Sequence, residues 1–100
     1  MEILYKPLSA ICRSLSDENR LRILIVIGNG KKSVSQIVEE IGLSQPLVSH
    51  HLKELRRNLL LKVERKGPFV YYEMADGEVL QTLKKLNTLA SDLLKNQDIF

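Results

Sequence analysis

The sequence predicts one domain that is mostly α with a small β-hairpin, and three observations carry this prediction. Apolar residues recur at helical spacing along most of the 100 residues. Gly42 stands in a very short connection between two helical segments, as in a helix-turn-helix. From Leu61 onwards the apolar period changes from helical to the alternation of a strand. The expected order is therefore four helices, two strands and one helix.

Length, composition and charge limit the class of protein. A chain of 100 residues is long enough for one core, so residues 1–100 are interpreted as a single domain. Cys12 is the single cysteine, which excludes an intrachain disulfide and a Cys-rich zinc site. The longest apolar run, residues 23–27, is far shorter than the roughly 20 residues of a membrane span. We expect a cytoplasmic protein without a membrane partner and without a cofactor.

The first two helices follow each other closely. The first is predicted over about residues 7–15, with Pro7 in its first turn. Its apolar stripe has spacings of 4, 3 and 4 and consists of Leu4, Leu8, Ile11 and Leu15. Ser16 is the expected N-cap of the second helix. Because residues 21–27 are apolar nearly all round, we expect this second helix to be central and buried.

The helix-turn-helix is predicted over about residues 33–60. Ser33 and Gln36 have the spacing of a capping box, and Gly42 suits the left-handed end of that helix. Ser44 is the expected N-cap of the next helix. One face of this next helix is apolar, with Val48, Leu52, Leu55 and Leu59. The opposite face is polar and basic, with Pro46, His50, Lys53 and Arg57, and with Gln45, Ser49 and Arg56 on its shoulder.

The distribution of charge favours a polyanionic partner for this segment. Residues 44–67 carry six basic and two acidic side chains, whereas the rest of the chain has a net charge of −1. A helix that enters the major groove of DNA needs one face fixed to a core and another that carries donors for phosphates and base edges. A solvated basic face without a ligand is the alternative interpretation.

The last two elements are a hairpin over about residues 61–74 and a helix over about residues 77–95. The apolar stripe of this last helix is wider than one small core can cover. We interpret part of it, together with the stripe of the first helix, as a homodimer interface. The alternative is that both stripes complete the core of one protomer. The predicted interface residues are Leu4, Leu8, Ile11, Leu83, Leu86, Ala90 and Leu93.

Residues 10–75 resemble the arsenic-repressor (ArsR) family of winged-helix regulators. The most specific part is the run Ser-Gln-Pro-x-x-Ser-x-His-Leu-Lys at residues 44–53, followed by a basic hairpin that ends in Tyr71-Tyr72. The resemblance implies a winged helix-turn-helix with the hairpin as its wing. It also implies a homodimeric repressor that binds an inverted repeat in double-stranded DNA and is released by an inducer.

The resemblance also implies which residues contact DNA. Gln45, Ser49, His50 and Lys53 fall on positions that contact or flank bases, and the basic residues of the wing tip fall on positions near the backbone or the minor groove. Glutamine can pair with adenine, and lysine and arginine neutralise phosphate. The expected DNA contacts are Ser44, Gln45, Pro46, Ser49, His50, Lys53, Arg57, Arg65 and Lys66.

Departures from the family pattern concern the effector and two turns. Ser33 and Ser35 stand where many members have the Cys-x-Cys of a metal site, and the last helix has no histidine for a second site. We therefore expect no metal and a non-metal signal of unknown identity. Leu59 stands where the family usually has glycine, so we expect Asn58 to take the left-handed conformation and the helix to end one residue earlier. Pro68 is expected to stiffen the wing turn.

Four groups leave an alternative open. Cys12 is interpreted as a small buried core residue, with a redox or metal role as the alternative. His51 is expected near the core with a structural hydrogen bond, and a metal site or catalytic base is the alternative for the pair with His50. Lys31 and Lys32 are interpreted as a solvated pair or a phosphate contact. Tyr71 and Tyr72 either brace the wing and its core or stack on bases.

Two other function classes are alternatives to DNA binding. A winged-helix module that binds protein and not DNA would need an acidic or apolar recognition face, which residues 45–57 do not present. An enzyme would need a phosphate loop, a dinucleotide fingerprint, a metalloprotease motif or a nucleophile with a base nearby, and the sequence has none of these. We therefore expect no enzyme.

Overall fold

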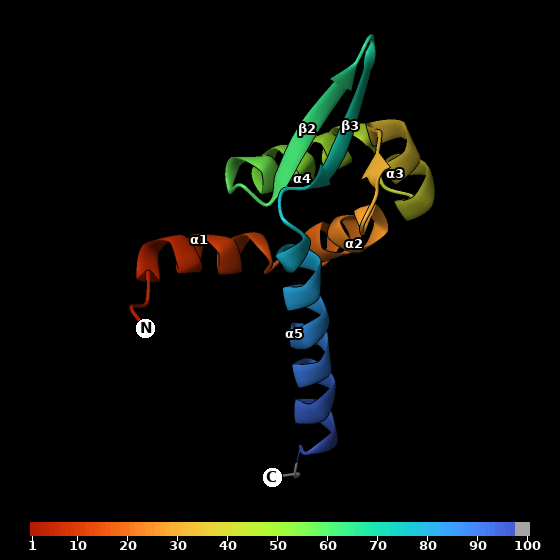
Figure 1. The fold of residues 1–100 in the computed structure, drawn as a ribbon. Coiled ribbons are helices and arrows are strands. Elements are labelled where there is room, and N and C mark those ends of the chain that lie inside the picture. Colours follow the sequence, from red (N-terminus) through yellow and green to blue (C-terminus); the bar gives the residue numbers. More distant parts are fainter. Residues whose placement is uncertain (98–100) are drawn as a thin grey trace.

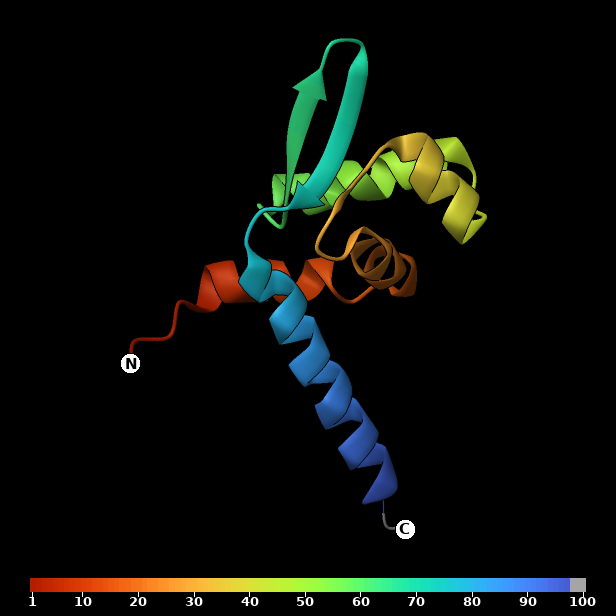
Figure 2. The same ribbon diagram turned by 45° about the vertical axis from the view of Figure 1, so that its right-hand side comes forward.

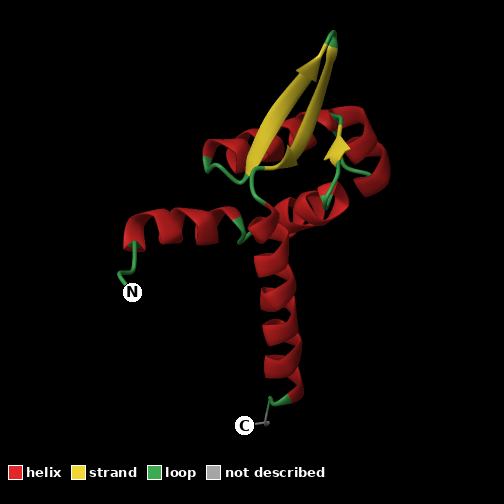
Figure 3. Ribbon diagram, viewed as in Figure 1, coloured by secondary structure: helices red, strands yellow, loops and turns green. Residues whose placement is uncertain are grey.

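A computed structural model describes residues 1–97 and confirms the predicted fold class (Figure 1). Helices and a small antiparallel sheet alternate along the chain, and Figure 3 separates the two by colour. The sheet has the strand order β1-β3-β2. The elements are α1 (Tyr5–Ser14), α2 (Glu18–Ile27), β1 (Lys31–Lys32), α3 (Val34–Ile41), α4 (Gln45–Arg57), β2 (Leu61–Lys66), β3 (Phe69–Met74) and α5 (Gly77–Lys95).

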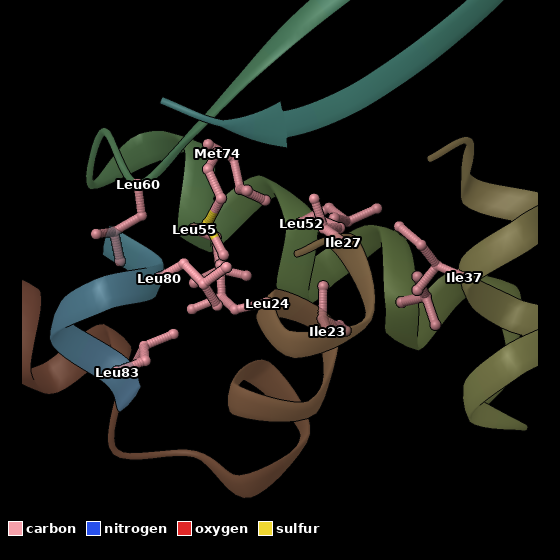
Figure 4. Close-up of a cluster of buried hydrophobic side chains, with 12 residues drawn as sticks. Ile23, Leu24, Ile27, Ile37, Leu52, Leu55, Leu60, Met74, Leu80 and Leu83 are labelled. Carbon is pink, nitrogen blue, oxygen red and sulfur yellow. The ribbon is translucent and has the colours of Figure 1, made fainter. Parts of the chain in front are cut away.

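The core lies between α2, α3 and α4, and it is closed by the root of the hairpin and the first turns of α5 (Figure 4). Burial of each aliphatic side chain contributes about 1.5–3 kcal/mol, so this cluster is the main source of stability. The expectation that α2 is central is confirmed for Ile23, Leu24 and Ile27. It is wrong for Ile25, which is 56% exposed on the side of α2 away from this core.

The helix-turn-helix has the predicted caps. The Ser33 hydroxyl accepts from the Gln36 backbone N–H, and the Gln36 side chain accepts from the Ser33 N–H, which completes the capping box. Gly42 has φ 79°, the left-handed conformation that glycine adopts without strain. The Ser44 hydroxyl accepts from the Leu47 N–H at 3.3 Å and so caps α4.

The connection between α1 and α2 differs from the prediction. Helix α1 begins at Tyr5, before Pro7, and α2 is capped by Asp17 instead of Ser16. The Asp17 carboxylate accepts from the Arg20 N–H at 3.0 Å. Ser16 donates its hydroxyl backwards, to the Arg13 carbonyl at 2.7 Å, so this side chain serves the end of α1.

The end of α4 also differs from the prediction. Leu59, and not Asn58, has the left-handed conformation, with φ 65°. The Leu60 N–H donates to the Leu55 carbonyl and the Leu59 N–H to the Arg56 carbonyl, the two bonds of a Schellman motif. The Asn58 side chain donates instead to the Ser14 hydroxyl and the Glu54 carbonyl. A leucine therefore occupies the position at which helices usually have glycine.

Strand β1 was not predicted. It pairs antiparallel with β3, with Lys31 opposite Glu73 and Lys32 opposite Tyr72. Two residues are too few to show the alternation by which strands are recognised in a sequence. This short strand adds a third member to the root of the hairpin.

Helices α1 and α5 project from the body in different directions (Figures 1 and 2). The radius of gyration is 15.1 Å, larger than the roughly 13 Å of a compact chain of this length. The Arg20 guanidinium holds the end of α1 by donating to the Ser14 carbonyl at 2.6 Å. In α5 only the first turns enter the core, through Leu80 and Leu83. Across the described residues, no helix is long and apolar enough to cross a membrane.

Candidate nucleic-acid interface

Helix α4 has two chemically opposite faces. Val48, Leu52 and Leu55 are fully buried and fix the helix to α2 and α3. The predicted DNA contacts of this helix and its cap lie on the outer side. Ser44, Gln45, Pro46, His50, Lys53 and Arg57 are exposed, and Ser49 is half-buried. The helix therefore presents donors and cations from a rigid support, as major-groove recognition requires.

The side chains on the outer face of α4 make few hydrogen bonds and ion pairs with other residues. Gln45 Nε2 lies 3.4 Å from Ser49 Oγ, a long hydrogen bond that a stronger ligand can replace. Arg57 is 3.2 Å from the Glu54 carboxylate. Lys53 forms no ion pair with any residue in 1–97, so its full charge is available to an anion.

The wing carries its two predicted contacts at its tip. Arg65 pairs with Val70 and Lys66 with Phe69, the last pairs before the turn. Gly67 in that turn has φ 59°, so the turn needs glycine there. Both basic side chains are exposed, and Lys66 Nζ lies 3.6 Å from the Glu64 carboxylate. Because β2 follows α4 directly, the hairpin rises from the same side of the body as α4 (Figure 1).

His51 lies on the core side of α4, as predicted, but the expected hydrogen bond is not formed. Its Nε2 is 3.8 Å from Asp17 Oδ2, too far for a hydrogen bond, and its Nδ1 is buried without a partner. Burial lowers the pKa of His51 from its ordinary value. The Arg20 N–H, by donating to Asp17, lowers the pKa of that carboxyl. The neutral imidazole is therefore the form that the fold accommodates.

His50 and His51 do not converge on one ligand position. His50 is exposed on the outer face, and the two ring centroids are 5.7 Å apart with planes tilted by 57°. Within residues 1–97, no group of three or more His, Cys, Asp or Glu is arranged to hold a metal ion. Ser33, at one of the two family metal positions, uses its hydroxyl in the capping box.

Two other predictions are corrected by the burial of the side chains. Cys12 is exposed and not a core residue, because α1 projects from the body. Leu83, predicted at the dimer interface, is only 7% exposed and belongs to the core of the protomer. The other predicted interface residues, Leu4, Leu8, Ile11, Leu86, Ala90 and Leu93, are exposed.

Lys31 is exposed and Lys32 is half-buried, and both ammonium groups are held in ion pairs with carboxylates. Lys32 Nζ is 2.6 Å from the Glu40 carboxylate on α3. Lys31 forms an ion pair with Glu64 on β2, and its Nζ is 3.8 Å from Glu73 on β3. No sequence signal indicated this arrangement, because it depends on the pairing of β1 with β3.

An apolar groove of about 740 Å³ runs between α2 and α5. Leu21 and Ile25 form one wall, and Leu83, Leu86 and Ala90 form the other. The exposure of Ile25 and Leu86 is thus part of one continuous apolar surface that reaches from the body onto the projecting helix.

Comparisons with known proteins agree with this geometry. The family model described as bacterial regulatory protein, arsR family, matches residues 17–61. The arsenical resistance operon repressor of Staphylococcus aureus is 34% identical over 87 residues, which cover 84% of this chain and 84% of that protein. HlyU from Vibrio cholerae superposes with a TM-score of 0.78 and 28% identity, covering 89% of this chain and 97% of HlyU.

A third likeness concerns the fold alone. The homodimeric winged helix-turn-helix DNA-binding domain of Mb0332 from Mycobacterium bovis superposes with a TM-score of 0.85 at 23% identity. This match covers 97% of this chain and 90% of that domain, so α1 and α5 are included.

Proposed function

The chain belongs to the ArsR family and is a DNA-binding transcriptional regulator, and from this premise we propose that it acts as a homodimeric repressor of an inverted-repeat operator. One observation carries the proposal. The outer face of α4 carries polar and basic side chains that are exposed except for the half-buried Ser49, while Val48, Leu52 and Leu55 on its inner face are fully buried. Such a helix can enter the major groove without moving relative to the body.

We assign the DNA contacts to three places. Gln45, Ser49 and His50 face base edges, because their amide, hydroxyl and imidazole groups donate and accept hydrogen bonds. Lys53 and Arg57 bind phosphate further along α4, and Ser44 and Pro46 approach the backbone at its start. Arg65 and Lys66 bind the backbone or the minor groove from the wing tip.

The dimer is proposed to form through α1 and α5. The exposed leucines of the predicted interface and the groove between α2 and α5 supply an apolar surface that one protomer leaves open; these leucines are Leu4, Leu8, Leu86 and Leu93. Two-fold symmetry would bring the same surface of a second copy against it and would pair two recognition helices about 34 Å apart, one turn of DNA. The homodimeric Mb0332 domain, which extends over both helices, supports this assignment.

We propose that a non-metal signal releases the repressor. Ser33 and Ser35 offer hydroxyls where thiolates would be needed for a soft metal ion, and the Ser33 hydroxyl already accepts a hydrogen bond from Gln36. The arsenical signal named for the Staphylococcus aureus relative is therefore not assigned to this chain.

The test is fluorescence anisotropy with the DNA upstream of the chain's own gene and a scrambled duplex, each titrated with salt. We expect tighter binding to the native duplex and a steep fall of log K with log salt. Lys53→Ala should lower that slope by about one unit for each protomer bound, hence about two for a dimer. Lys85→Ala, which removes the same charge from an exposed position of α5, is the matched control and should leave the slope unchanged.

Two results would overturn the proposal. One is equal binding of both duplexes at all salt concentrations, which would indicate general DNA affinity. The other is binding that survives the combined substitutions Gln45→Ala, Lys53→Ala and Arg65→Ala without change. An absence of binding even at low salt would favour a winged-helix module that binds protein.

A further inference from the structure

The wing has little support beyond its root. Strands β2 and β3 extend away from the body (Figures 1 and 2), and the contacts with the core are near their root, where Leu61 and Met74 are buried and Tyr72 packs against the core. A two-stranded hairpin by itself is marginally stable in water. Its direction therefore depends on what holds its lower half.

Lys31 contacts both strands of the wing from outside it. Strand β1 pairs with β3, which places Lys31 opposite Glu73. The Lys31 ammonium also reaches past β3 and forms an ion pair with Glu64 on β2. Lys62 of β2 adds a contact of 3.8 Å to the Glu73 carboxylate. By the strand register, Lys31, Glu73 and Lys62 form one row across the three strands. Glu64 lies two residues nearer the tip on the same face, which is opposite the face of Leu61 and Met74.

The contact with Glu64 lies next to the DNA-binding tip. Glu64 is followed directly by Arg65 and Lys66. Glu64 itself is half-buried, and the two residues of β2 beyond it are exposed. A cross-strand tie at this position limits the bending and twisting of the part of the wing that has no other support.

The ionisation of the pair is favourable at neutral pH. Hydrogen bonding to Glu64 raises the pKa of Lys31, and the same bond lowers the pKa of Glu64. With two carboxylates against it, Lys31 has no uncompensated charge to offer to a phosphate. It also neutralises acidic groups that would otherwise repel DNA from the wing.

We propose that Lys31 is a positioning residue for DNA binding, which ties β1 to Glu64 and Glu73 and thereby fixes the direction of the wing that carries Arg65 and Lys66. The proposal rests on the proposed function for its effect on DNA affinity. Its effect on the wing itself is independent of DNA. The two can therefore be measured apart.

The first measurement asks whether Glu64→Gln tightens or weakens binding to DNA. Glu64→Gln removes a negative charge from a DNA-binding element, so by charge alone it should tighten binding. If the tie to Lys31 positions the wing, Glu64→Gln should weaken binding to the native duplex, by about threefold to tenfold. Glu39→Gln makes the same change of charge at an exposed position of α3 and is the matched control. Tighter binding by Glu64→Gln would overturn the proposal.

The second measurement separates positioning from phosphate contact. Lys31→Met keeps the aliphatic stem and removes the charge. It should weaken binding by a similar factor while the slope of log K against log salt stays unchanged. A slope lowered by about one unit for each protomer would identify Lys31 as a phosphate contact instead. The double exchange Lys31→Glu with Glu64→Lys should restore much of the affinity.

The third measurement needs no DNA. Backbone ¹⁵N relaxation of the whole chain should give lower order parameters for residues 64–71 in Lys31→Met and Glu64→Gln, but not in Glu39→Gln. Order parameters that stay at the wild-type value would overturn the proposal even if affinity changes. If the wild-type chain binds no DNA, the proposed function fails, and the order parameters still decide whether Lys31 fixes the wing.

Discussion

The same spacing of apolar residues gives buried side chains in the body and exposed side chains in the projecting helices. In α4, apolar residues at spacings of 4 and 3 are fully buried, as at Val48, Leu52 and Leu55. In α1 and α5, the same spacing leaves Leu8 48% and Leu86 46% exposed. Helical periodicity identifies which face is apolar, but it does not say whether the same chain or a second copy covers that face.

The largest expected effect is in the body. Leu52→Ala removes a fully buried side chain from the contact of α4 with α2 and α3, and should lower the free energy of unfolding by about 2–5 kcal/mol. Urea unfolding at a fixed protomer concentration measures this change. Leu94→Ala, at an exposed position of α5 outside the predicted interface, is the control and should stay within about 0.5 kcal/mol. Equal losses in the two variants would contradict the distinction between the regions.

The next effect concerns association. Leu86→Glu places a charge on the apolar surface of α5 and should weaken homodimer formation about a hundredfold or more, because that charge would be buried in the proposed interface. Sedimentation equilibrium measures the dissociation constant, and circular dichroism should show that the helices persist. Gln81→Glu adds the same charge at an exposed, non-apolar position of α5 and should leave association unchanged. A wild-type chain that stays monomeric would refute the dimer itself.

Most of the fold could be predicted from the sequence because its signals are local. Capping residues, the spacing of the α4 face and the change of period at Leu61 each depend on a few neighbouring side chains. The nine predicted DNA contacts combine the polar face of one helix with the positions that the family resemblance implies, and all lie at or near the surface.

The features that were missed depend on contacts between distant segments. Asn58 uses its side chain on Ser14, 44 positions away, so the left-handed position falls to Leu59. The role of Lys31 depends on Glu64, 33 positions away, through a strand too short to predict. Cys12 and Leu83 were misjudged because periodicity does not say which end of a helix reaches the core.

A pH change should act on the body and on neither projecting helix, because both histidines of the chain are in α4. Burial lowers the pKa of His51 from its ordinary value of 6.5. As the pH falls below about 6.5, the unfolded chain takes up a proton that the folded chain does not. The free energy of unfolding should therefore fall with pH, by at most about 1.4 kcal/mol per pH unit, until the folded pKa is reached.

Urea unfolding between pH 7 and pH 5 measures this dependence. His51→Gln should abolish the part that His51 contributes, whereas His50→Gln, a matched change on the exposed face, should retain it. Asp17 does not contribute between pH 7 and pH 5. Its pKa is lowered from 3.8, so the stability that its carboxylate contributes is lost only as the pH falls below about that value. A profile that is the same for His51→Gln and the wild-type chain would show that the burial of His51 has no energetic consequence.

Leu59 is an exposed leucine that belongs to the body and not to a projecting helix. Its side chain is 81% exposed, although it lies on neither α1 nor α5. Its φ of 65° shows that it occupies the left-handed position of the turn that ends α4, so the exposure follows from the turn and not from an interface with a second protomer. Leu59→Gly removes the steric cost of a side chain in the left-handed conformation. It should raise the free energy of unfolding by about 1 kcal/mol and leave the dimer dissociation constant unchanged. Leu59→Ala, which removes the apolar surface but keeps Cβ, should give little of this gain. If Leu59→Gly weakened the dimer instead, the exposed leucine would belong to the interface, and the boundary between the two regions would have to be redrawn.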